Sequence, residues 1–195
     1  MQKLQVDSRA RALIFDLDGT LADTMPLHYR AWQSVADRHD FHFPEELFYA
    51  WAGIPTTRIA RLLNEKFGYS LEPLQMEEEK ESVYLQLAGH EVTPVQPVVD
   101  LLMRHYQQMP VSCGTGNLRE VALLTLKGLQ LEPVLKLLVS ADDVEQPKPA
   151  PDTFLECARL MGTEPQYCQV FEDGEPGLQA AEAAGMIATD IRSFV

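Results

Sequence analysis

Short apolar runs alternate with longer stretches of helical periodicity along most of the chain. Five of the runs are apolar enough to form strands that are buried on both faces, at 12–15, 110–113, 137–140, 169–171 and 187–189. Between them, apolar residues recur three and four positions apart, as in amphipathic helices, at about 98–108, 118–127, 152–161 and 177–184. Strands and helices that alternate in this way predict βαβ units, and so an α/β protein with a Rossmann-like, doubly wound parallel sheet.

One segment interrupts this alternation. Between residues 24 and 94 the pattern predicts no buried strand, only helices, at 27–39, 44–50, 57–66 and 74–87. A helical block inserted directly after the first strand predicts an α-helical cap domain on an α/β core. We therefore expect a core domain of residues 1–23 and 95–195, and a helical cap domain of residues 24–94.

The charge of the chain narrows the choice of partners. Among 195 residues, 16 are lysine or arginine and 29 are aspartate or glutamate, which gives a net charge of −13 at pH 7. Because such a surface repels polyanions, we expect no nucleic-acid partner and no anionic membrane partner. A small anionic substrate stays compatible with this charge, since one local pocket can oppose the overall field.

Cysteine content and hydropathy predict a cytoplasmic protein. Cys113, Cys157 and Cys168 have no spacing typical of a zinc site or a disulfide framework, which fits a reducing compartment. The first residues lack the apolar stretch of a signal peptide, and no uncharged apolar run is long enough to span a membrane. We expect a monomer or a weak dimer.

The first predicted strand ends abruptly in acidic residues. Asp16 follows the apolar run 12–15, and Asp18 and Gly19 come soon afterwards. In open α/β sheets ligands bind at the carboxyl ends of strands, and two carboxylates this close favour a bound cation or a shared proton. Mg²⁺, a hard cation with oxygen ligands, suits the pair. A solvated Asp-Gly turn is the plain alternative; a calcium loop is disfavoured because its twelfth position is Leu27 and not glutamate.

A second acidic pair ends another predicted strand. Glu172 and Asp173 follow the apolar run 169–171 and precede Gly174. Taken alone, such a pair is most often a turn. Because the carboxyl ends of parallel strands lie at one edge of a sheet, we expect the two acidic pairs to converge there as the halves of one metal site.

Four landmarks follow one another along the chain: the segment from Asp16 to Thr20, then Thr115, then Lys148, and then the pair Glu172 and Asp173. In this order they resemble the nucleophile motif, the phosphate-binding residue, the motif lysine and the acidic metal motif of the haloacid dehalogenase superfamily, in its phosphatase and phosphomutase branch with a helical cap after the first motif. The resemblance spans nearly the whole chain. The sequence departs from the family pattern at Gly174, where many relatives carry serine. Glycine lacks the hydroxyl group of serine, but the acidic pair Glu172 and Asp173 is kept.

This resemblance implies a chemical role for each acidic residue. Asp16 would attack phosphorus and form an aspartyl-phosphate, and Asp18 would protonate the leaving oxygen and then deprotonate water. The implied cofactor is Mg²⁺, which would relieve the repulsion between the nucleophile and the phosphate. Its implied ligands are Asp16, the backbone carbonyl of Asp18 and Asp173, with Glu172 as a further ligand or as a partner of one.

The resemblance also implies how the phosphoryl group would be held. Lys148 would neutralise the nucleophile and the phosphoryl oxygens, although most lysines are simply solvated. Thr115, Gly116 and Asn117 precede the helix expected from 118, so they would bind phosphate at the positive end of that helix. Asn117 is equally compatible with a role as the N-cap of the helix.

In the cap, resemblance to the β-phosphoglucomutase-like members of the family implies substrate-facing residues at Thr24, His28, Gly53, Arg58 and Lys80. In mutase-like members the matching histidine and lysine orient the acid/base aspartate and the sugar, and the arginine contacts a distal phosphate. His28 is as readily a polar residue of the first helical turn, and Lys80 a partner of acidic neighbours at helical spacing. Arg58 has the better case, because a cap arginine above an acidic core can clamp a phosphate or a carboxylate. Trp32 is expected in the core of the cap.

Three functions are consistent with these residues. The first is a Mg²⁺-dependent phosphatase for a small sugar phosphate, of the fructose-1-phosphate or 6-phosphogluconate type. The second is a β-phosphoglucomutase-like isomerase, which returns the phosphoryl group to sugar instead of to water. The third is a catalytically inactive binding module on the same fold, which the intact catalytic and metal-binding motifs disfavour. We favour the phosphatase, with a small phosphorylated sugar as its partner.

Overall fold

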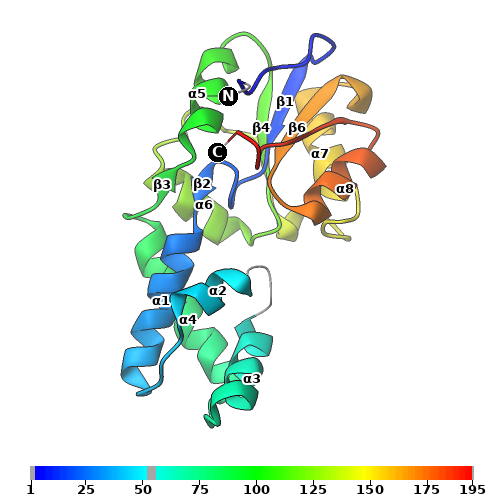
Figure 1. Cartoon of the computed structure of the whole chain (residues 1–195). Coiled ribbons are helices and arrows are strands. Elements are labelled where there is room, and N and C mark those ends of the chain that lie inside the picture. Colours follow the sequence, from blue (N-terminus) through cyan, green and yellow to red (C-terminus); the bar gives the residue numbers. More distant parts are fainter. Residues whose placement is uncertain (1–2, 52–55, 195) are drawn as a thin grey trace. The chain divides into compact units, whose positions relative to one another are not determined.

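The computed structural model describes residues 3–51 and 56–194. The chain forms two compact units (Figure 1). One consists of Met1–Asp23 with Val92–Val195 and contains a parallel sheet, and the other is Thr24–Glu91 and is helical. The helical unit is therefore an insertion in the chain after the first strand of the sheet.

Within the described residues, the sheet has five parallel strands in the order β5-β4-β1-β6-β7. Their bounds are β1 Ala12–Phe15, β4 Val111–Gly114, β5 Leu138–Val139, β6 Cys168–Glu172 and β7 Ile187–Asp190. The first strand is central, and its Phe15 lies opposite Cys113 of β4 and Phe171 of β6. Each predicted strand is present, and the predicted doubly wound α/β fold is confirmed.

Helices cover both faces of the sheet. Those of this unit are α5 Gln96–His105, α6 Arg119–Gly128, α7 Asp152–Met161 and α8 Glu175–Ala183. Because crossovers between parallel strands are right-handed, the strand order places α5 and α6 on one face and α7 and α8 on the other. Figure 1 shows α7 and α8 together on one side of the sheet. Buried side chains of these two helices pack with Ile14 and Val170 of the central strands.

Two helices of the core begin earlier than the apolar pattern predicts. Helix α8 begins at Glu175 and not at 177, and α5 begins at Gln96 and not at 98. Each has a proline, Pro176 or Pro97, in its first turn. Proline suits this position because the N–H that it lacks would have no partner within the helix.

The helical unit is built around aromatic side chains. Its helices are α1 Met25–Arg38, α2 Glu45–Ala50, α3 Thr56–Phe67 and α4 Pro73–Ala88, and α4 packs against both α1 and α3. Trp32 is 1% exposed, and its ring meets that of Phe43 edge-on with 5.4 Å between the centroids. The expectation that Trp32 is a core residue of this unit is therefore confirmed.

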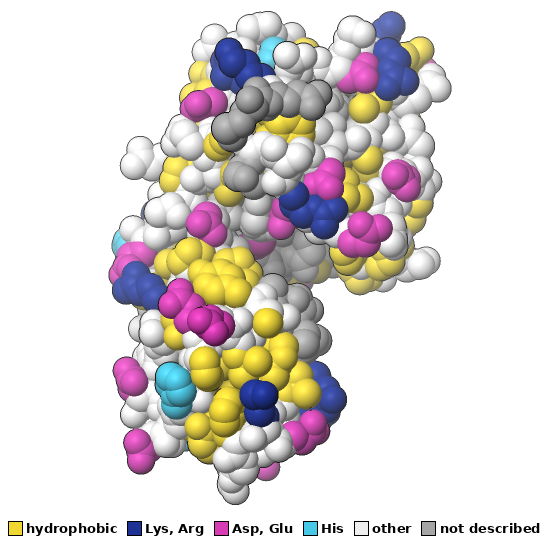
Figure 2. Space-filling model, viewed as in Figure 1, with side chains coloured by type: hydrophobic (Ala, Val, Ile, Leu, Met, Phe, Trp, Pro, Cys, Tyr) yellow, Lys and Arg dark blue, Asp and Glu magenta, His cyan; other side chains and the backbone are white. Residues whose placement is uncertain are grey.

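The surface of the helical unit mixes apolar and charged side chains. On the face that Figure 2 presents, hydrophobic side chains of this unit gather between acidic and basic groups. Its most exposed large apolar residues are Tyr49, Phe67 and Leu74, which belong to three different helices. Across residues 3–51 and 56–194, none of the helices is both long enough and apolar enough to cross a membrane.

A short antiparallel ribbon lies where the chain passes between the units. Strand β2 (Ala22–Asp23) pairs with strand β3 (Thr93–Pro94). The apolar pattern does not predict this pair, because strands of two residues carry no periodicity. The ribbon keeps Thr93–Pro94 with the sheet-containing unit, so the helical unit ends at Glu91 and not at the expected residue 94.

Candidate active site

The sheet brings the predicted motifs to one edge. The carboxyl end of β1 leads into Asp16, whose backbone N–H donates to the carbonyl of Phe171 on β6 at 3.1 Å. Thr115 follows β4, and its N–H donates to the carbonyl of Val139 on β5 at 2.9 Å. Glu172 is the last residue of β6. Residues that the sequence predicts to act together therefore follow neighbouring parallel strands at their carboxyl ends.

Lys148 joins two of the acidic side chains. Its Nζ donates to Oδ1 of Asp16 at 2.6 Å and to Oε1 of Glu172 at 2.8 Å, and none of the three side chains is more than 9% exposed. The Nζ also lies 4.6 Å from the ring centroid of Phe154, within the range of a cation–π contact. Burial lowers the pKa of Lys148, but the charges of Asp16 and Glu172 outweigh burial and raise that pKa. The lysine is therefore positively charged in the folded protein.

Three carboxyl groups gather at this lysine. Asp16, Glu172 and Asp173 each offer one oxygen, and these oxygens lie within 4.8 Å of one another. Burial and the negative charge of Asp16 raise the pKa of Glu172 to about 7, and the same two causes raise the pKa of Asp173. Carboxylate oxygens that repel one another at this spacing are the donors that a hard divalent cation favours. The residues present therefore fit a divalent metal ion.

Two glycines make room for the acidic cluster. Gly19 has a φ of +81°, a left-handed conformation that favours glycine, and a Cβ there would lie 2.1 Å from Oδ2 of Asp173. A Cβ on Gly177, near the start of α8, would lie 1.7 Å from Oε1 of Glu172. A side chain at either position would displace a carboxyl group, so the geometry of the cluster depends on both glycines.

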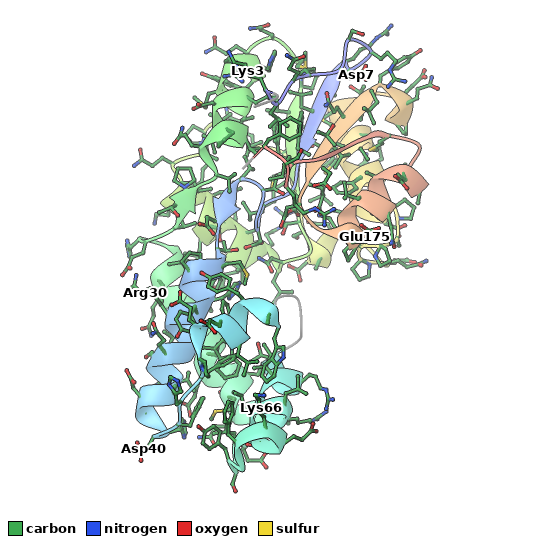
Figure 3. The ribbon with its side chains drawn as sticks, in the orientation of Figure 1. Lys3, Asp7, Arg30, Asp40, Lys66 and Glu175 are labelled. Carbon is green, nitrogen blue, oxygen red and sulfur yellow. The ribbon has the colours of Figure 1, made fainter. Side chains whose placement is uncertain are left out.

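Hydrogen bonds orient the second acidic pair. Thr20, which is fully buried, donates from Oγ1 to Oδ1 of Asp173 at 2.9 Å. The N–H of Gly174 donates to Oε2 of Glu172 at 2.6 Å. The chain continues from this pair into α8, whose first residue, Glu175, is labelled in Figure 3. Thr20 belongs to the first motif, so its hydrogen bond ties that motif to the second acidic pair.

Asp18 is not a member of the cluster of three carboxyl groups. Its Oδ2 accepts a hydrogen bond from Nδ2 of Asn117 at 2.6 Å, and the backbone N–H of Asn117 donates to Oγ1 of Thr115 at 3.1 Å. Helix α6 begins at Arg119 with Leu118 as its N-cap, so the interpretation of Asn117 as the N-cap is wrong. The physical reason is that its amide group donates to a carboxyl group instead. A metal contact through the backbone carbonyl of Asp18 stays a prediction.

In the helical unit, His28 and Lys80 share an aromatic partner. The His28 ring stacks on that of Tyr84 with 4.1 Å between the centroids, and Nζ of Lys80 lies 5.2 Å from the Tyr84 centroid. Lys80 is buried, and its Nζ is 3.4 Å from Oε2 of Glu81. Burial and the charge of Lys80 lower the pKa of His28 to about 3, so the imidazole is neutral. The sequence alone does not predict Tyr84 as the partner of His28 and Lys80, because its contact with His28 depends on how α1 packs against α4.

Two of the other predicted cap residues, Thr24 and Arg58, lie near the starts of helices. Thr24 is 2% exposed and directly precedes α1, where its carbonyl accepts the N–H of His28 at 3.0 Å. Arg58 lies near the start of α3, with its side chain 50% exposed and 3.4 Å from a carboxyl oxygen of Glu65. Gly53 lies outside the described residues. Roles in substrate binding for all the predicted cap residues stay predictions.

A model of the haloacid dehalogenase-like hydrolases matches residues 13–190, a span that includes each motif at the edge of the sheet. The chain belongs to this family. The fructose-1-phosphate phosphatase YqaB of Escherichia coli K12 is 40% identical to this hydrolase over 184 residues, which cover 94% of this chain and 97% of that protein. The β-phosphoglucomutase of Bacillus subtilis 168 is 26% identical over 188 residues, which cover 93% of this chain and 83% of that protein.

Solved structures include close matches to the fold of this hydrolase. One is a HAD family hydrolase from Deinococcus radiodurans R1 with bound phosphate and sodium, which has a TM-score of 0.78 and 25% sequence identity. The match covers 94% of this chain and 80% of that one. This family member is therefore an enzyme whose relatives include both phosphatases and a phosphomutase.

Proposed function

We propose that this hydrolase is a Mg²⁺-dependent phosphatase that acts on a small sugar phosphate, of the fructose-1-phosphate or 6-phosphogluconate type. The observation that carries the proposal is the pairing of buried Lys148 with Asp16 and Glu172, beside Asp173. It joins a carboxylate nucleophile to a cation and to oxygen donors for a metal, as transfer of a phosphoryl group requires. The E. coli relative, a fructose-1-phosphate phosphatase, supports the class of substrate.

Asp16 is the nucleophile in this mechanism. Its carboxylate, held by Lys148 through Oδ1, attacks phosphorus in line with the sugar oxygen. The bond from Asp16 to phosphorus forms as the bond from phosphorus to the sugar oxygen breaks, and the product is an aspartyl-phosphate. Asp18 supplies the proton that the departing oxygen takes up.

Water completes the reaction. Asp18, now ionised, accepts a proton from a water molecule as the water oxygen attacks phosphorus. The bond from phosphorus to Asp16 breaks, which restores the carboxylate and releases inorganic phosphate. One turnover therefore returns Asp16 and Asp18 to their starting protonation states.

The phosphoryl oxygens are bound by groups in the loops that follow β4 and β5. Lys148 offsets their charge while two of its N–H groups hold Asp16 and Glu172. Oγ1 of Thr115 accepts the N–H of Asn117, so the hydroxyl proton of Thr115 can be donated to a phosphoryl oxygen. Gly116 is exposed just before α6, where backbone N–H groups favour an anion.

The acidic cluster is the proposed Mg²⁺ site. Asp16, Asp173 and the backbone carbonyl of Asp18 would hold the ion, with Glu172 as a further ligand or as a partner of one. When bound, Mg²⁺ supplies positive charge that offsets the repulsion between nucleophile and phosphate. The raised pKa values of Glu172 and Asp173 support this assignment, because they arise from burial and from the nearby charge of Asp16.

A phosphomutase of the β-phosphoglucomutase type is the second candidate. The cluster of His28 and Lys80 on Tyr84 favours it, because these residues resemble those with which mutase-like relatives orient the sugar. The B. subtilis relative supports it as well. We favour hydrolysis because the relative with 40% identity is a phosphatase. An inactive binding module is disfavoured by the direct contacts of Lys148 with Asp16 and Glu172.

Phosphate release from a panel of sugar phosphates separates these candidates. Each sugar phosphate is incubated with the protein, with and without Mg²⁺, and the inorganic phosphate released is measured. We expect Mg²⁺-dependent release from at least one sugar phosphate. Conversion of β-glucose 1-phosphate to glucose 6-phosphate without net phosphate release would establish the mutase instead, and no turnover of any substrate would favour the binding module.

A further inference from the structure

The side chain of Asn117 makes a contact that a helix cap does not explain. Its Nδ2 lies 2.6 Å from Oδ2 of Asp18, although the two residues are 99 positions apart in the chain. The N–H₂ group of the amide is the donor, and a carboxyl oxygen can accept this bond whether or not Asp18 carries its proton. The fold, and not local sequence, creates the contact between the loops that follow β1 and β4.

The backbone of Asn117 is held from two sides. Its N–H donates to Oγ1 of Thr115 at 3.1 Å, and its carbonyl accepts the N–H of Ala141 at 2.9 Å. Ala141 begins a short 3₁₀ turn, Ala141–Asp143, in the loop after β5. The loop that carries Asn117 is therefore tied to the loop that leads on to Lys148.

Arg119 strengthens the link between these two loops. Its backbone N–H donates to Oδ2 of Asp142 at 2.7 Å, and its Nη2 donates to Oδ2 of Asp143 at 2.6 Å and to the carbonyl of Leu138 at 3.1 Å. Asp143 in turn accepts the hydroxyl of Ser140 at 2.6 Å. These contacts fix the start of α6, so the amide group of Asn117 is a donor whose position is set before substrate binds.

We infer that Asn117 is a positioning residue that holds the carboxyl group of Asp18 in place for its proton transfers. The inference rests on the proposed function, in which Asp18 is the general acid and base. A general acid accelerates a reaction about 10²- to 10⁴-fold, and only when its proton lies within reach of the departing oxygen. Without the amide of Asn117, the Asp18 side chain can rotate away, and part of this acceleration is lost.

Two substrates with different leaving groups test the inference. A sugar alkoxide needs a proton as it leaves, whereas p-nitrophenolate is stable as an anion. For Asn117→Ala we expect kcat/KM to fall about 10- to 100-fold on fructose 1-phosphate, or on another sugar phosphate found in the panel, and less than about threefold on p-nitrophenyl phosphate. The ratio kcat/KM is the right measure, because it reports the loss of transition-state stabilisation for the first phosphoryl transfer. Asp18→Asn should show the same selectivity to a larger extent.

Two further variants complete the design. Leu118→Ala alters the same loop at a side chain that is 58% exposed, and it should leave the ratio of the two kcat/KM values unchanged. Asn117→Asp keeps the shape of the side chain but sets a second carboxyl group against Asp18. Asn117→Asp should lower kcat/KM on the sugar phosphate at least as much as Asn117→Ala does. If Asn117→Ala does not fold, Asn117→Asp is used for the test instead.

Equal falls on both substrates, together with weaker inhibition by inorganic phosphate, would assign Asn117 to phosphate binding and overturn the inference. Unchanged kinetics on both substrates would overturn it as well. Failure of the proposed function has a different signature, because the wild-type protein itself would then release no phosphate from any sugar phosphate.

Discussion

Lys148→Met removes the cation that joins Asp16 to Glu172. Lys148 makes hydrogen bonds of 2.6 Å and 2.8 Å to these buried carboxyl groups. Hydrogen bonds to charged groups contribute about 1.5–3 kcal/mol each. Removing one partner of a buried ion pair costs about 3–5 kcal/mol, because the other charge is left buried and unpaired. In EDTA at about pH 8 we therefore expect the variant to lose about 3–5 kcal/mol of unfolding free energy.

This cost should shrink as the pH falls. The pKa of Glu172 is raised from 4.5 to about 7 in the folded protein. Its protonated form therefore contributes stability that is fully present below about pH 4.5 and is lost as the pH rises through about 7. Without Lys148, protonation of Glu172 removes a buried charge that nothing else offsets. The difference in unfolding free energy between variant and wild type should thus be smaller at about pH 5 than at about pH 8.

Urea unfolding in EDTA at these two pH values measures the difference. Lys136→Met is the matched control, because it replaces an exposed lysine and should change the unfolding free energy by less than about 0.5 kcal/mol. The reasoning is refuted if Lys148→Met is as stable as the wild type at the higher pH. It is also refuted if the loss is equal at both pH values.

Three further substitutions probe the surroundings of the site. Gly177→Ala should destabilise the protein by about 1–3 kcal/mol in thermal unfolding, because its Cβ would lie 1.7 Å from Oε1 of Glu172; a wild-type midpoint would contradict this. Thr20→Val removes the 2.9 Å hydrogen bond to Asp173 and should raise the Mg²⁺ concentration for half-maximal activity about tenfold, whereas Thr20→Ser should restore it. Arg58→Ala should raise KM with little change in kcat, and an unchanged KM on every substrate would remove Arg58 from the site.

The acidic edge of the sheet is the part of the site that sequence predicts best. Asp16 and Glu172 end apolar runs, and the ends of parallel strands meet at one edge, so their approach follows from the pattern alone. The contact of Asn117 with Asp18 does not follow, because local rules favour a helix cap at a residue of this type and position. Hydrogen bonds between distant loops depend on how those loops are placed by the fold.

In the helical unit, too, the sequence predicts the helices but not the contacts between them. Periodicity predicts its helices, whereas the stacking of His28 on Tyr84 depends on the packing of α1 against α4. The ribbon of β2 and β3 is missed because each strand has only two residues. Patterns along the chain therefore predict elements and strand ends, and contacts between elements require the folded structure.

Phosphate release by the wild type and by Asp16→Asn, on the same sugar phosphate, tests most directly whether Asp16 attacks phosphorus in a Mg²⁺-dependent phosphatase. Asparagine keeps the shape of the side chain and an oxygen that can accept the hydrogen bond from Lys148, so the variant should fold. We predict Mg²⁺-dependent release by the wild type and none above background by the folded variant. Full release by Asp16→Asn would contradict the account.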